Sequence, residues 1–347
     1  MAKYNIDGID VISLSGSWRE MGRQYGELAD IHLHHVYDYV VKKAEVNEDG
    51  MSRVTDIAEK LFAKYPHYLY EFFEGMAETS TLTPLQLRVC NAVEYAEPCF
   101  FCSALVTWND YAEDNLVFGR NYDAMSYAEL AQDIVFTVYH PDDALSFVTI
   151  GYAGEIYCVN GFNECGIFIE LNNGMPSAGD TIHWEMCPST SSLFDMLTKV
   201  RTLDDVEQFF AATQSFASFI ITVADANEGR AYEWCYDGVR RADRMLPNGL
   251  VVSTNHYIHK DWEYPTPTDD ASWCSLTRHA NLMSKANVLK GDIDEKMMQR
   301  IMDTPVDAGG SFNEYTRYQL VVVPARKRIW VKTGITSWTA IDIAQFM

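Results

Sequence analysis

The sequence predicts an α+β protein in which sheets are layered with helices. Three observations lead to this fold class. Apolar residues repeat with a period of about 3.6 before residue 101 and about 2 after it. Blocks of strand-like segments alternate with pairs of helix-like segments, without a regular strand–helix–strand alternation. The 347 residues, 48% of them hydrophobic, are enough to bury one large core or two smaller ones.

The segment before residue 101 is predicted to be mainly helical. A short strand at 11–14 is followed by a helix over 18–43. Ser17 is the predicted N-cap of this helix, and Glu20, three residues later, completes a capping box. Further helices are predicted at 53–77 and at 84–95, the latter with proline in its first position.

The segment after residue 101 is predicted to contain most of the strands, which are short and separated by Asp, Asn and Gly turns. Strands are predicted at 103–108, 115–120, 134–140, 145–151, 156–161, 166–172, 217–225, 230–236, 249–255, 318–324 and 327–333. Helices are predicted at 190–200, 203–213, 274–288 and 293–302.

Composition excludes several classes of partner. The chain has 27 basic and 49 acidic residues, a net charge of −22, which argues against nucleic acid and anionic membranes as ligands. The N-terminal residues lack an apolar signal region, and no stretch approaches the ~18 apolar residues of a spanning helix. We therefore expect a cytoplasmic protein that acts on a small molecule. The sequence leaves its oligomeric state open, and a homo-oligomer is compatible with it.

Eight cysteines are spread along the chain without the spacing of a disulfide framework. Cys99 and Cys102 form a C-x-x-C pair, for which redox chemistry, metal binding and a coincidental pair of buried thiols are all open interpretations. A zinc site needs about four ligands, and no second C-x-x-C or H-x-x-x-H pair completes one. A thioredoxin-like motif lies between a strand and a helix, whereas here a helix precedes and a strand follows. We therefore predict no metal and no organic cofactor.

Cys102 stands where the helical segment meets the first strand of the second segment. A predicted hairpin turn at 109–115 returns the chain in the antiparallel direction. This return would bring Arg120 and Asp123 back beside Cys102. A thiol, a guanidinium and a carboxylate are thus expected at one end of a hairpin.

Five short motifs, in a consistent order, resemble a known enzyme family. The chain is similar to the N-terminal-nucleophile hydrolases of the isopenicillin N acyltransferase type (peptidase family C45), and more distantly to choloylglycine hydrolases and penicillin V acylases. The resemblance extends over nearly the whole chain. Its motifs are the opening GSWREMGRQYG at 16–26, GRNYD at 119–123, GFNECG at 161–166 with Leu171-Asn172 after it, Thr254-Asn255-His256, and Arg278-His279.

The resemblance implies a four-layer αββα fold and a precursor that cleaves itself between Phe101 and Cys102. Residues 1–101 would then be a helical propeptide or small-subunit segment that stays bound, and residues 102–347 the catalytic segment of the same compact domain. The implied reaction is hydrolysis of a linear amide bond of an N-acyl small molecule through an acyl-cysteine. Acyl transfer to an amine and a non-catalytic relative remain alternatives. The acyl group and the leaving amine stay open.

The resemblance also implies roles for the residues around Cys102, the nucleophile. Asp123 corresponds to an aspartate that orients the new α-amino group, and turn capping is its structural alternative. Arg120 corresponds to an arginine beside the nucleophile in the choloylglycine branch, where it would favour the thiolate. The alternative for Arg120 is an ordinary surface arginine on an edge strand.

Three further residues carry over in the same way. Asn255 corresponds to an asparagine whose amide helps form an oxyanion hole, and Asn172 to a second oxyanion position that uses mainly the backbone N–H. Each has a turn-stabilising asparagine as its alternative. Arg278 corresponds to an arginine near the nucleophile, with a surface salt bridge as its alternative. His256 is interpreted as structural.

Overall fold

The computed structural model describes residues 1–45, 50–96 and 101–347. Over these residues the strands form two sheets, one of nine strands and one of six. The larger sheet has the order β1-β2-β5-β6-β7-β8-β9-β10-β11, and the smaller has the order β12-β3-β4-β13-β14-β15. Neighbouring strands are antiparallel except for β2 and β5, which pair in parallel. The α+β fold class is confirmed.

The strands are close to their predicted positions, and β1, β11 and β15 are additional to the prediction. The larger sheet contains β1 (Ala2–Ile6), β2 (Ile9–Gly16), β5 (Ile134–Pro141), β6 (Phe147–Tyr152), β7 (Asn160–Asn163), β8 (Phe168–Asn173), β9 (Phe219–Ala224), β10 (Gly229–Cys235) and β11 (Gly238–Arg241). The smaller sheet contains β3 (Ser103–Thr107), β4 (Val117–Asp123), β12 (Leu250–Ser253), β13 (Thr316–Val323), β14 (Arg328–Thr333) and β15 (Thr339–Asp342).

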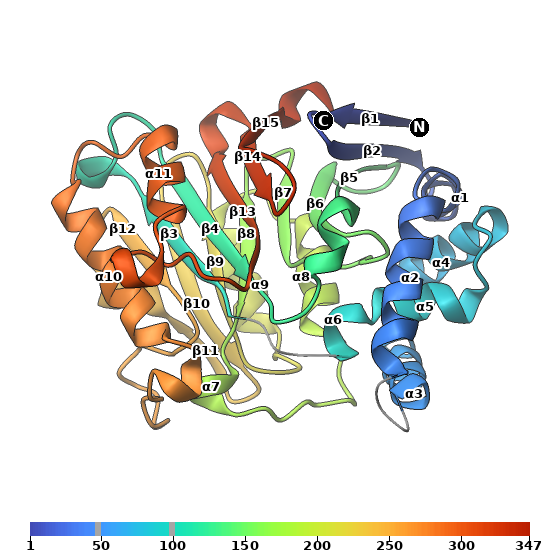
Figure 1. Ribbon diagram of the computed structural model, residues 1–347, viewed down its shortest axis with the longest axis horizontal. Coiled ribbons are helices and arrows are strands. Elements are labelled where there is room, and N and C mark those ends of the chain that lie inside the picture. Colours follow the sequence, from blue (N-terminus) through green and yellow to red (C-terminus); the bar gives the residue numbers. More distant parts are fainter. Residues whose placement is uncertain (46–49, 97–100) are drawn as a thin grey trace.

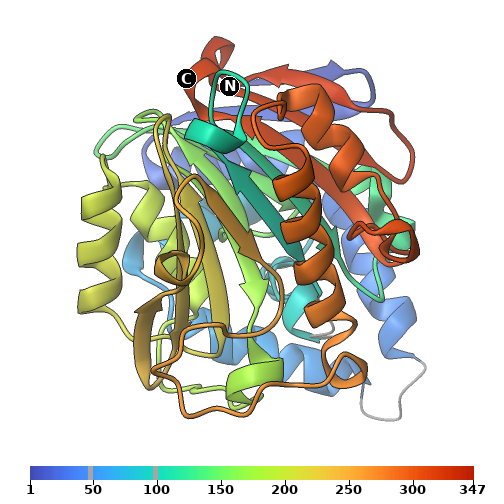
Figure 2. The ribbon, with the colours of Figure 1, turned by 90° about the vertical axis from the view of Figure 1, so that its left-hand side faces the viewer.

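The helices divide into three groups (Figure 1). The N-terminal group lies beside the sheets and contains α1 (Trp18–Leu28), α2 (Asp30–Ala44), α3 (Gly50–Phe62), α4 (His67–Thr79), α5 (Pro84–Asn91) and α6 (Val93–Ala96). The second group is α7 (Met175–Ala178), α8 (Ser189–Leu197) and α9 (Leu203–Ala212). The third is α10 (Ser275–Val288) and α11 (Glu295–Met302). In Figure 2 the pairs α8–α9 and α10–α11 lie on opposite sides of the strands, which gives four layers.

Alternation along the strands of the smaller sheet produces two cores. On β13, Leu320 and Val322 belong to the main core between the sheets, whereas Val321 and Val323 pack in a second core. Leu282 of α10 and Met298 of α11 belong to that second core. Successive side chains of a strand point to opposite faces. A strand that is buried on both faces, such as β13, therefore contributes to the core on each side of its sheet.

The N-terminal helices differ from the prediction in their breaks. The helix predicted over 18–43 is divided at Ala29, and the helix over 53–77 is divided before Pro66, which is the N-cap of α4. Proline lacks the backbone N–H that a continuous helix needs. The first break has a tertiary cause: Asp30 accepts hydrogen bonds from Ser80 and Thr81, which tie the first turn of α2 to the end of α4.

Ser17 caps α1 as predicted by accepting the Glu20 N–H, but among the described residues no reciprocal bond from the Glu20 side chain completes the predicted capping box. A full capping box forms instead between Thr83 and Gln86 at the start of α5. Helices α1 and α4 approach so closely that a Cβ atom on Gly22 of α1 would lie only 2.0 Å from the Phe72 carbonyl oxygen of α4. This contact makes the N-terminal group compact. Within the described residues, no helix is long and apolar enough to cross a membrane.

Candidate active site

Cys102 lies directly before β3 and is buried, with 1% of its surface exposed. Strands β3 and β4 pair in antiparallel register, with Ala104 opposite Arg120. The predicted hairpin is therefore confirmed, and Arg120 Nη2 lies 3.5 Å from Cys102 Sγ. Cys99 lies outside the described residues.

Arg120 is fully buried between the sheets, so the surface-arginine alternative is wrong. Its Nη1 donates to the Glu170 carboxylate, and its Nη2 also donates to the Leu171 carbonyl at 2.9 Å. Burial alone would lower the pKa of Arg120, but Cys102 and Glu170 outweigh burial and raise it. Burial raises the pKa of Glu170 to about 7, although Arg120 opposes this shift. Arg120 therefore places a guanidinium beside the thiol, with the Glu170 carboxylate on its other side.

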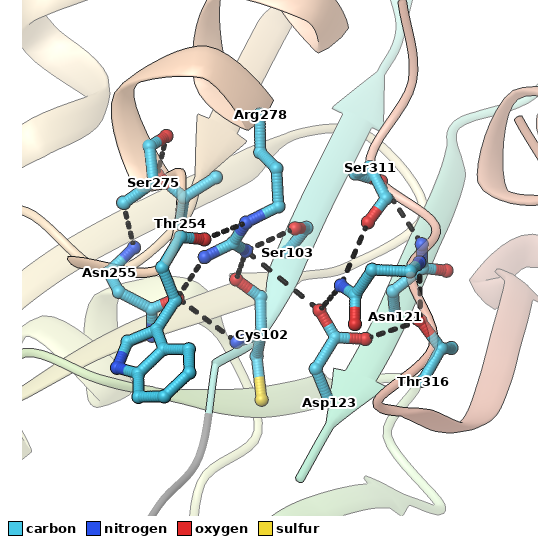
Figure 3. Close-up of polar contacts among 12 residues, drawn as sticks. Cys102, Ser103, Asn121, Asp123, Thr254, Asn255, Ser275, Arg278, Ser311 and Thr316 are labelled. Atoms are coloured by element: carbon cyan, nitrogen blue, oxygen red, sulfur yellow. Dashed lines mark hydrogen bonds and ion pairs between the residues drawn. The ribbon is translucent and has the colours of Figure 1, made fainter. Parts of the chain in front are cut away.

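A second arginine holds the backbone of Cys102 (Figure 3). Arg278 Nη1 donates to the Cys102 carbonyl at 2.6 Å and to Ser103 Oγ at 2.7 Å. Its Nη2 donates to Asn255 Oδ1 at 2.7 Å, and its Nε to the Trp273 carbonyl at 3.2 Å. Arg278 is 1% exposed, so the surface salt bridge is also excluded. Burial lowers its pKa, with Asp123 and Cys102 acting in the opposite direction.

Asn255 follows β12 and is fully buried. Its Oδ1 accepts the Cys102 N–H at 3.1 Å, and its Nδ2 donates to the Asn173 carbonyl at 2.8 Å. The amide orientation is determined by Arg278, because exchanging the two amide atoms would place an NH₂ group against the Arg278 and Cys102 donors. Ser275 Oγ accepts the Asn255 N–H at 2.7 Å and ties this turn to the start of α10.

Asp123 ends β4 and is fully buried. Its carboxylate accepts from Thr316 Oγ1 at 2.6 Å and from Asn313 Nδ2 at 2.8 Å, and it lies 4.0 Å from Arg278 Nη1. Its backbone carbonyl accepts the Phe101 N–H at 2.8 Å. Burial raises the pKa of Asp123 to about 6, while Arg278 and the two hydrogen bonds oppose the shift.

The thiol itself is protonated in this arrangement. Burial raises the pKa of Cys102 to about 12, and Asp123 contributes in the same direction, whereas Arg120 lowers it. A cysteine of this kind needs a base to become a nucleophile. The neighbouring histidines do not supply one within the described part of the site, because His256 is bonded to Ser275 Oγ at 2.8 Å and Thr254 Oγ1 at 3.2 Å.

Asn172 is fully buried on β8, and neither of its amide atoms has a hydrogen-bond partner among the described residues. Its neighbours Leu171 and Asn173 line the cavity beside Cys102. Alternate residues of a strand point to opposite faces, so the Asn172 side chain points away from that cavity. The structure therefore gathers four of the other five predicted site residues around Cys102, whereas the side chain of Asn172 is directed elsewhere.

Cys102 opens onto an apolar cavity of about 60 Å³. The cavity is lined by Glu94, Tyr95, Cys102, Tyr122, Val159, Leu171, Asn173, Met175, Ile182, Thr190, Phe216, Ala217 and Phe219. A larger hollow of about 700 Å³ between Trp18, Tyr68 and Phe209 contains none of the predicted site residues. The small cavity is the relevant one because the thiol forms part of its wall.

Several polar residues of the site were not predicted from the sequence. They are Glu170, which pairs with Arg120, and Ser103, Ser275, Asn313 and Thr316, which hold Arg278, Asn255 and Asp123. Glu170 carried a signal, since it is a charged residue inside an otherwise apolar predicted strand. The others are ordinary Ser, Thr and Asn residues, and only their positions in space give them a role.

Comparisons with known proteins show the family to which the chain belongs. A sequence model of the family described as acyl-coenzyme A:6-aminopenicillanic acid acyl-transferase matches residues 111–304, more than half of the chain. No curated protein sequence matches the chain. Among solved structures, a Caenorhabditis elegans N-acylethanolamine-hydrolyzing acid amidase ortholog is 18% identical with a TM-score of 0.50, over 64% of this chain and 93% of that one.

Two bacterial structures are also similar. A variant of conjugated bile acid hydrolase from Clostridium perfringens is 12% identical with a TM-score of 0.48, over 70% of this chain and 93% of that one. Penicillin V acylase from Agrobacterium tumefaciens is 11% identical with a TM-score of 0.41, over 70% of this chain and 87% of that one. The fold is that of the N-terminal-nucleophile hydrolases, and the chain is an enzyme of the hydrolase or acyltransferase class. The chain belongs to the acyl-coenzyme A:6-aminopenicillanic acid acyl-transferase family.

Proposed function

We propose that this protein is a cysteine amidase that activates itself by cleaving the bond between Phe101 and Cys102. One observation carries the proposal: the buried thiol of Cys102 lies 3.5 Å from the guanidinium of Arg120, while Arg278 and Asn255 hold the same residue's carbonyl and N–H. This arrangement places the positive charge of Arg120 beside the sulfur. It also restrains the backbone of Cys102, which carries the attacking thiol.

The activation step follows from the chemistry of the thiol. Cys102 Sγ attacks the Phe101 carbonyl carbon, the amide C–N bond breaks, and the Cys102 nitrogen takes a proton. The thioester formed is hydrolysed by water, which releases the Phe101 carboxylate and returns the thiol. Phe101 is 6% exposed and packs against Trp273 in a tilted arrangement, with ring centroids 4.2 Å apart, so this residue must leave its present position.

In this proposal the freed α-amino group of Cys102 is then the base. Its ordinary pKa is about 7.7–8.0, so it can take the thiol proton near neutral pH. In catalysis the thiol attacks the substrate amide, the amine leaves with a proton, and water hydrolyses the acyl-cysteine. Asp123 orients the new amino group, and Asn255 Nδ2 and the Asn172 backbone are the proposed oxyanion donors.

The cavity suggests the chemical character of the acyl group. Its wall is almost entirely apolar, with Leu171, Phe216 and Phe219 close to the thiol. Burying an apolar group releases about 25 cal/mol per Å² of buried surface. A volume of about 60 Å³ is well below that of a drug-sized ligand site, so the site either takes a short apolar acyl group or widens after Phe101 leaves.

Intact-mass analysis of the purified protein tests the proposal. The cleaved protein should give fragments of about 11.5 and about 28 kDa, in proportion to residues 1–101 and 102–347 of the 39.5 kDa chain. Cys102→Ala should remain in one piece. Cys99→Ala is the matched control, since a redox or metal role for the C-x-x-C pair requires both cysteines and the proposed cleavage requires only Cys102. Cleavage of Cys102→Ala at the parental rate would exclude the mechanism.

Acyl transfer is a second candidate, favoured by the description of the matching family as an acyl-transferase. Both reactions pass through the same acyl-cysteine and differ only in whether water or an amine removes the acyl group. Product analysis with a competing amine separates them. An amidase should release the free acid at a rate insensitive to the amine, whereas a transferase should form the new amide at the acid's expense.

A further inference from the structure

A cluster of two histidines and an aspartate lies away from Cys102. His32 and His35 are one turn apart on α2, and side chains three residues apart share one face of a helix. Both face Asp133, which ends the short 3₁₀ helix η2 (Ala128–Asp133) just before β5. His32 Nδ1 lies 2.8 Å and His35 Nδ1 lies 3.0 Å from Asp133 Oδ1.

We propose that His32, His35 and Asp133 bind a divalent transition-metal ion of the zinc class. The three potential ligand atoms lie within 4.8 Å of one another. Zinc binds imidazole nitrogen and carboxylate oxygen at about 2.0–2.2 Å, which places tetrahedral ligand atoms about 3.3 Å apart. The two distances from the imidazoles to Asp133 Oδ1, 2.8 and 3.0 Å, therefore need to lengthen by less than about 1 Å to admit the ion.

The aspartate supplies an independent indication. Asp133 is fully buried, yet its Oδ2 has no hydrogen-bond partner among the described residues, while Oδ1 faces both imidazoles. A buried carboxylate oxygen without a partner is costly. A cation bound by both oxygens of this carboxylate, beside the two imidazoles, would give Oδ2 a partner. Two nitrogens and one oxygen suit zinc better than calcium or magnesium, which prefer oxygen ligands alone.

The surroundings of His32 match those of a metal-ligating histidine. Its other nitrogen, Nε2, lies 2.8 Å from Asp10 Oδ2, and Lys3 Nζ lies 2.9 Å from the same oxygen. A histidine that binds a metal through one nitrogen usually donates the other N–H to a carboxylate, which fixes the tautomer.

The cluster is also accessible. The His35 side chain is 44% exposed, which provides an entry path and room for a water molecule as the fourth ligand. The ligands come from both sides of Cys102 in the sequence, since α2 precedes it and Asp133 follows it. If the proposed cleavage occurs, the ion would join the two fragments, and a chelator would weaken their association.

Cobalt and zinc titrations of the tag-free, full-length protein test the site. After EDTA treatment and dialysis, one equivalent of Co²⁺ should give the intense visible absorption of tetrahedral cobalt, and Zn²⁺ should displace it. His35→Ala should remove the band and weaken zinc binding at least 100-fold. Asp10→Asn, which alters only the second ligand sphere, should weaken it by about 10- to 100-fold.

His34→Ala is the matched control. His34 is 43% exposed on the same helix, but its Nε2 bonds to Thr81 Oγ1 at 2.6 Å and faces away from the cluster. This variant should bind both ions as the parent does. Absence of saturable binding in the parent, or equally tight binding in His35→Ala, would overturn the proposal. The titration is independent of cleavage, so its failure and the failure of the proposed function are distinguishable.

Discussion

Two buried arginines flank Cys102 and are held in opposite ways. Arg120 acts on the sulfur and is balanced by a buried charge, the Glu170 carboxylate. Arg278 acts on the backbone and is held mainly by neutral acceptors, the carbonyls of Cys102 and Trp273 and the Asn255 amide. Accordingly, the pKa of Arg120 is raised and that of Arg278 is lowered.

In the proposed mechanism, the difference separates two tasks that a thiol nucleophile requires. The Arg120–Glu170 pair controls the electrostatic potential at the sulfur, where a guanidinium favours the thiolate. Arg278 controls position, because hydrogen bonds to neutral groups depend on geometry more than on charge. Substitutions at the two arginines should therefore produce different patterns of stability and reactivity.

The largest effect is expected at Arg120. Arg120→Met should cost about 3–5 kcal/mol of unfolding free energy, because the buried Glu170 loses its partner. The double variant Arg120→Met/Glu170→Leu should recover most of this loss without recovering cleavage, since the charge beside the sulfur is still absent. Urea unfolding and intact mass measure the two properties.

An exposed arginine–glutamate pair provides the control for that experiment. Arg88 and Glu59 lie 2.8 Å apart, with 28% and 47% of their side chains exposed. Arg88→Met should change stability by less than about 1 kcal/mol. If the double variant Arg120→Met/Glu170→Leu cleaves normally, the charge of Arg120 is not needed to activate the Cys102 thiol.

Arg278→Met is expected to have the next largest effect. The Cys102 carbonyl loses its hydrogen-bond donor, and Asn255 Oδ1 loses one of its two donors. Together these losses should lower the free energy of unfolding by about 2–4 kcal/mol. Cleavage should stop, because the backbone beside the scissile bond is no longer restrained. Lys285→Met on the same helix should leave both properties unchanged. Normal cleavage in Arg278→Met would assign positioning to another residue.

The third prediction concerns pH and Asp123. Its pKa in the folded protein, about 6, lies above its ordinary value of 3.8, so its stabilising contribution is present below pH 4 and is lost as pH rises through 6. The stability of the parent relative to Asp123→Asn should therefore fall by about 2–3 kcal/mol between pH 4 and pH 7. Thermal unfolding at several pH values measures this difference.

Activity should respond to the same titration. Protonation of the α-amino base should lower kcat/KM of the cleaved enzyme below about pH 8. The Asp123 carboxylate can orient the new amino group only when ionised, so its protonation should add a second acid limb at lower pH. Asp123→Asn should be slow and lack this acid limb. If Asp123→Asn kept the same second acid limb in kcat/KM, that limb would come from a group other than Asp123.

The smallest effect is expected at Trp273, which packs against Phe101 on the other side of the scissile bond. Trp273→Ala should destabilise the uncleaved chain by about 0.5–1.5 kcal/mol through loss of the aromatic pair. Trp262→Ala removes a tryptophan that stacks on Tyr264 instead and controls for a general loss of packing. Measured cleavage rates should differ little between the two variants. If Trp273→Ala blocked cleavage completely, Trp273 would have a positioning role like that of Arg278.

Much of the fold could be predicted from the sequence because strands and helices have different periods. The change near residue 101 and the hairpin that returns Arg120 to Cys102 were both predicted correctly. The N-terminal helices were predicted too long. The division before Pro66 has a local cause that the sequence contains, whereas the division at Ala29 depends on Asp30 contacting residues 50 and 51 positions away.

The sequence by itself determined the order of the elements, the family motifs and the identity of Cys102 as the residue at their junction. Local periodicity and spacing carry that information. Only the tertiary structure decided which polar residues meet: it buried Arg120 against Glu170, directed Arg278 to the backbone of Cys102, and turned Asn172 away from the cavity. Such contacts join residues up to 176 positions apart, and the pairing of charges across two sheets leaves no periodic trace along the chain.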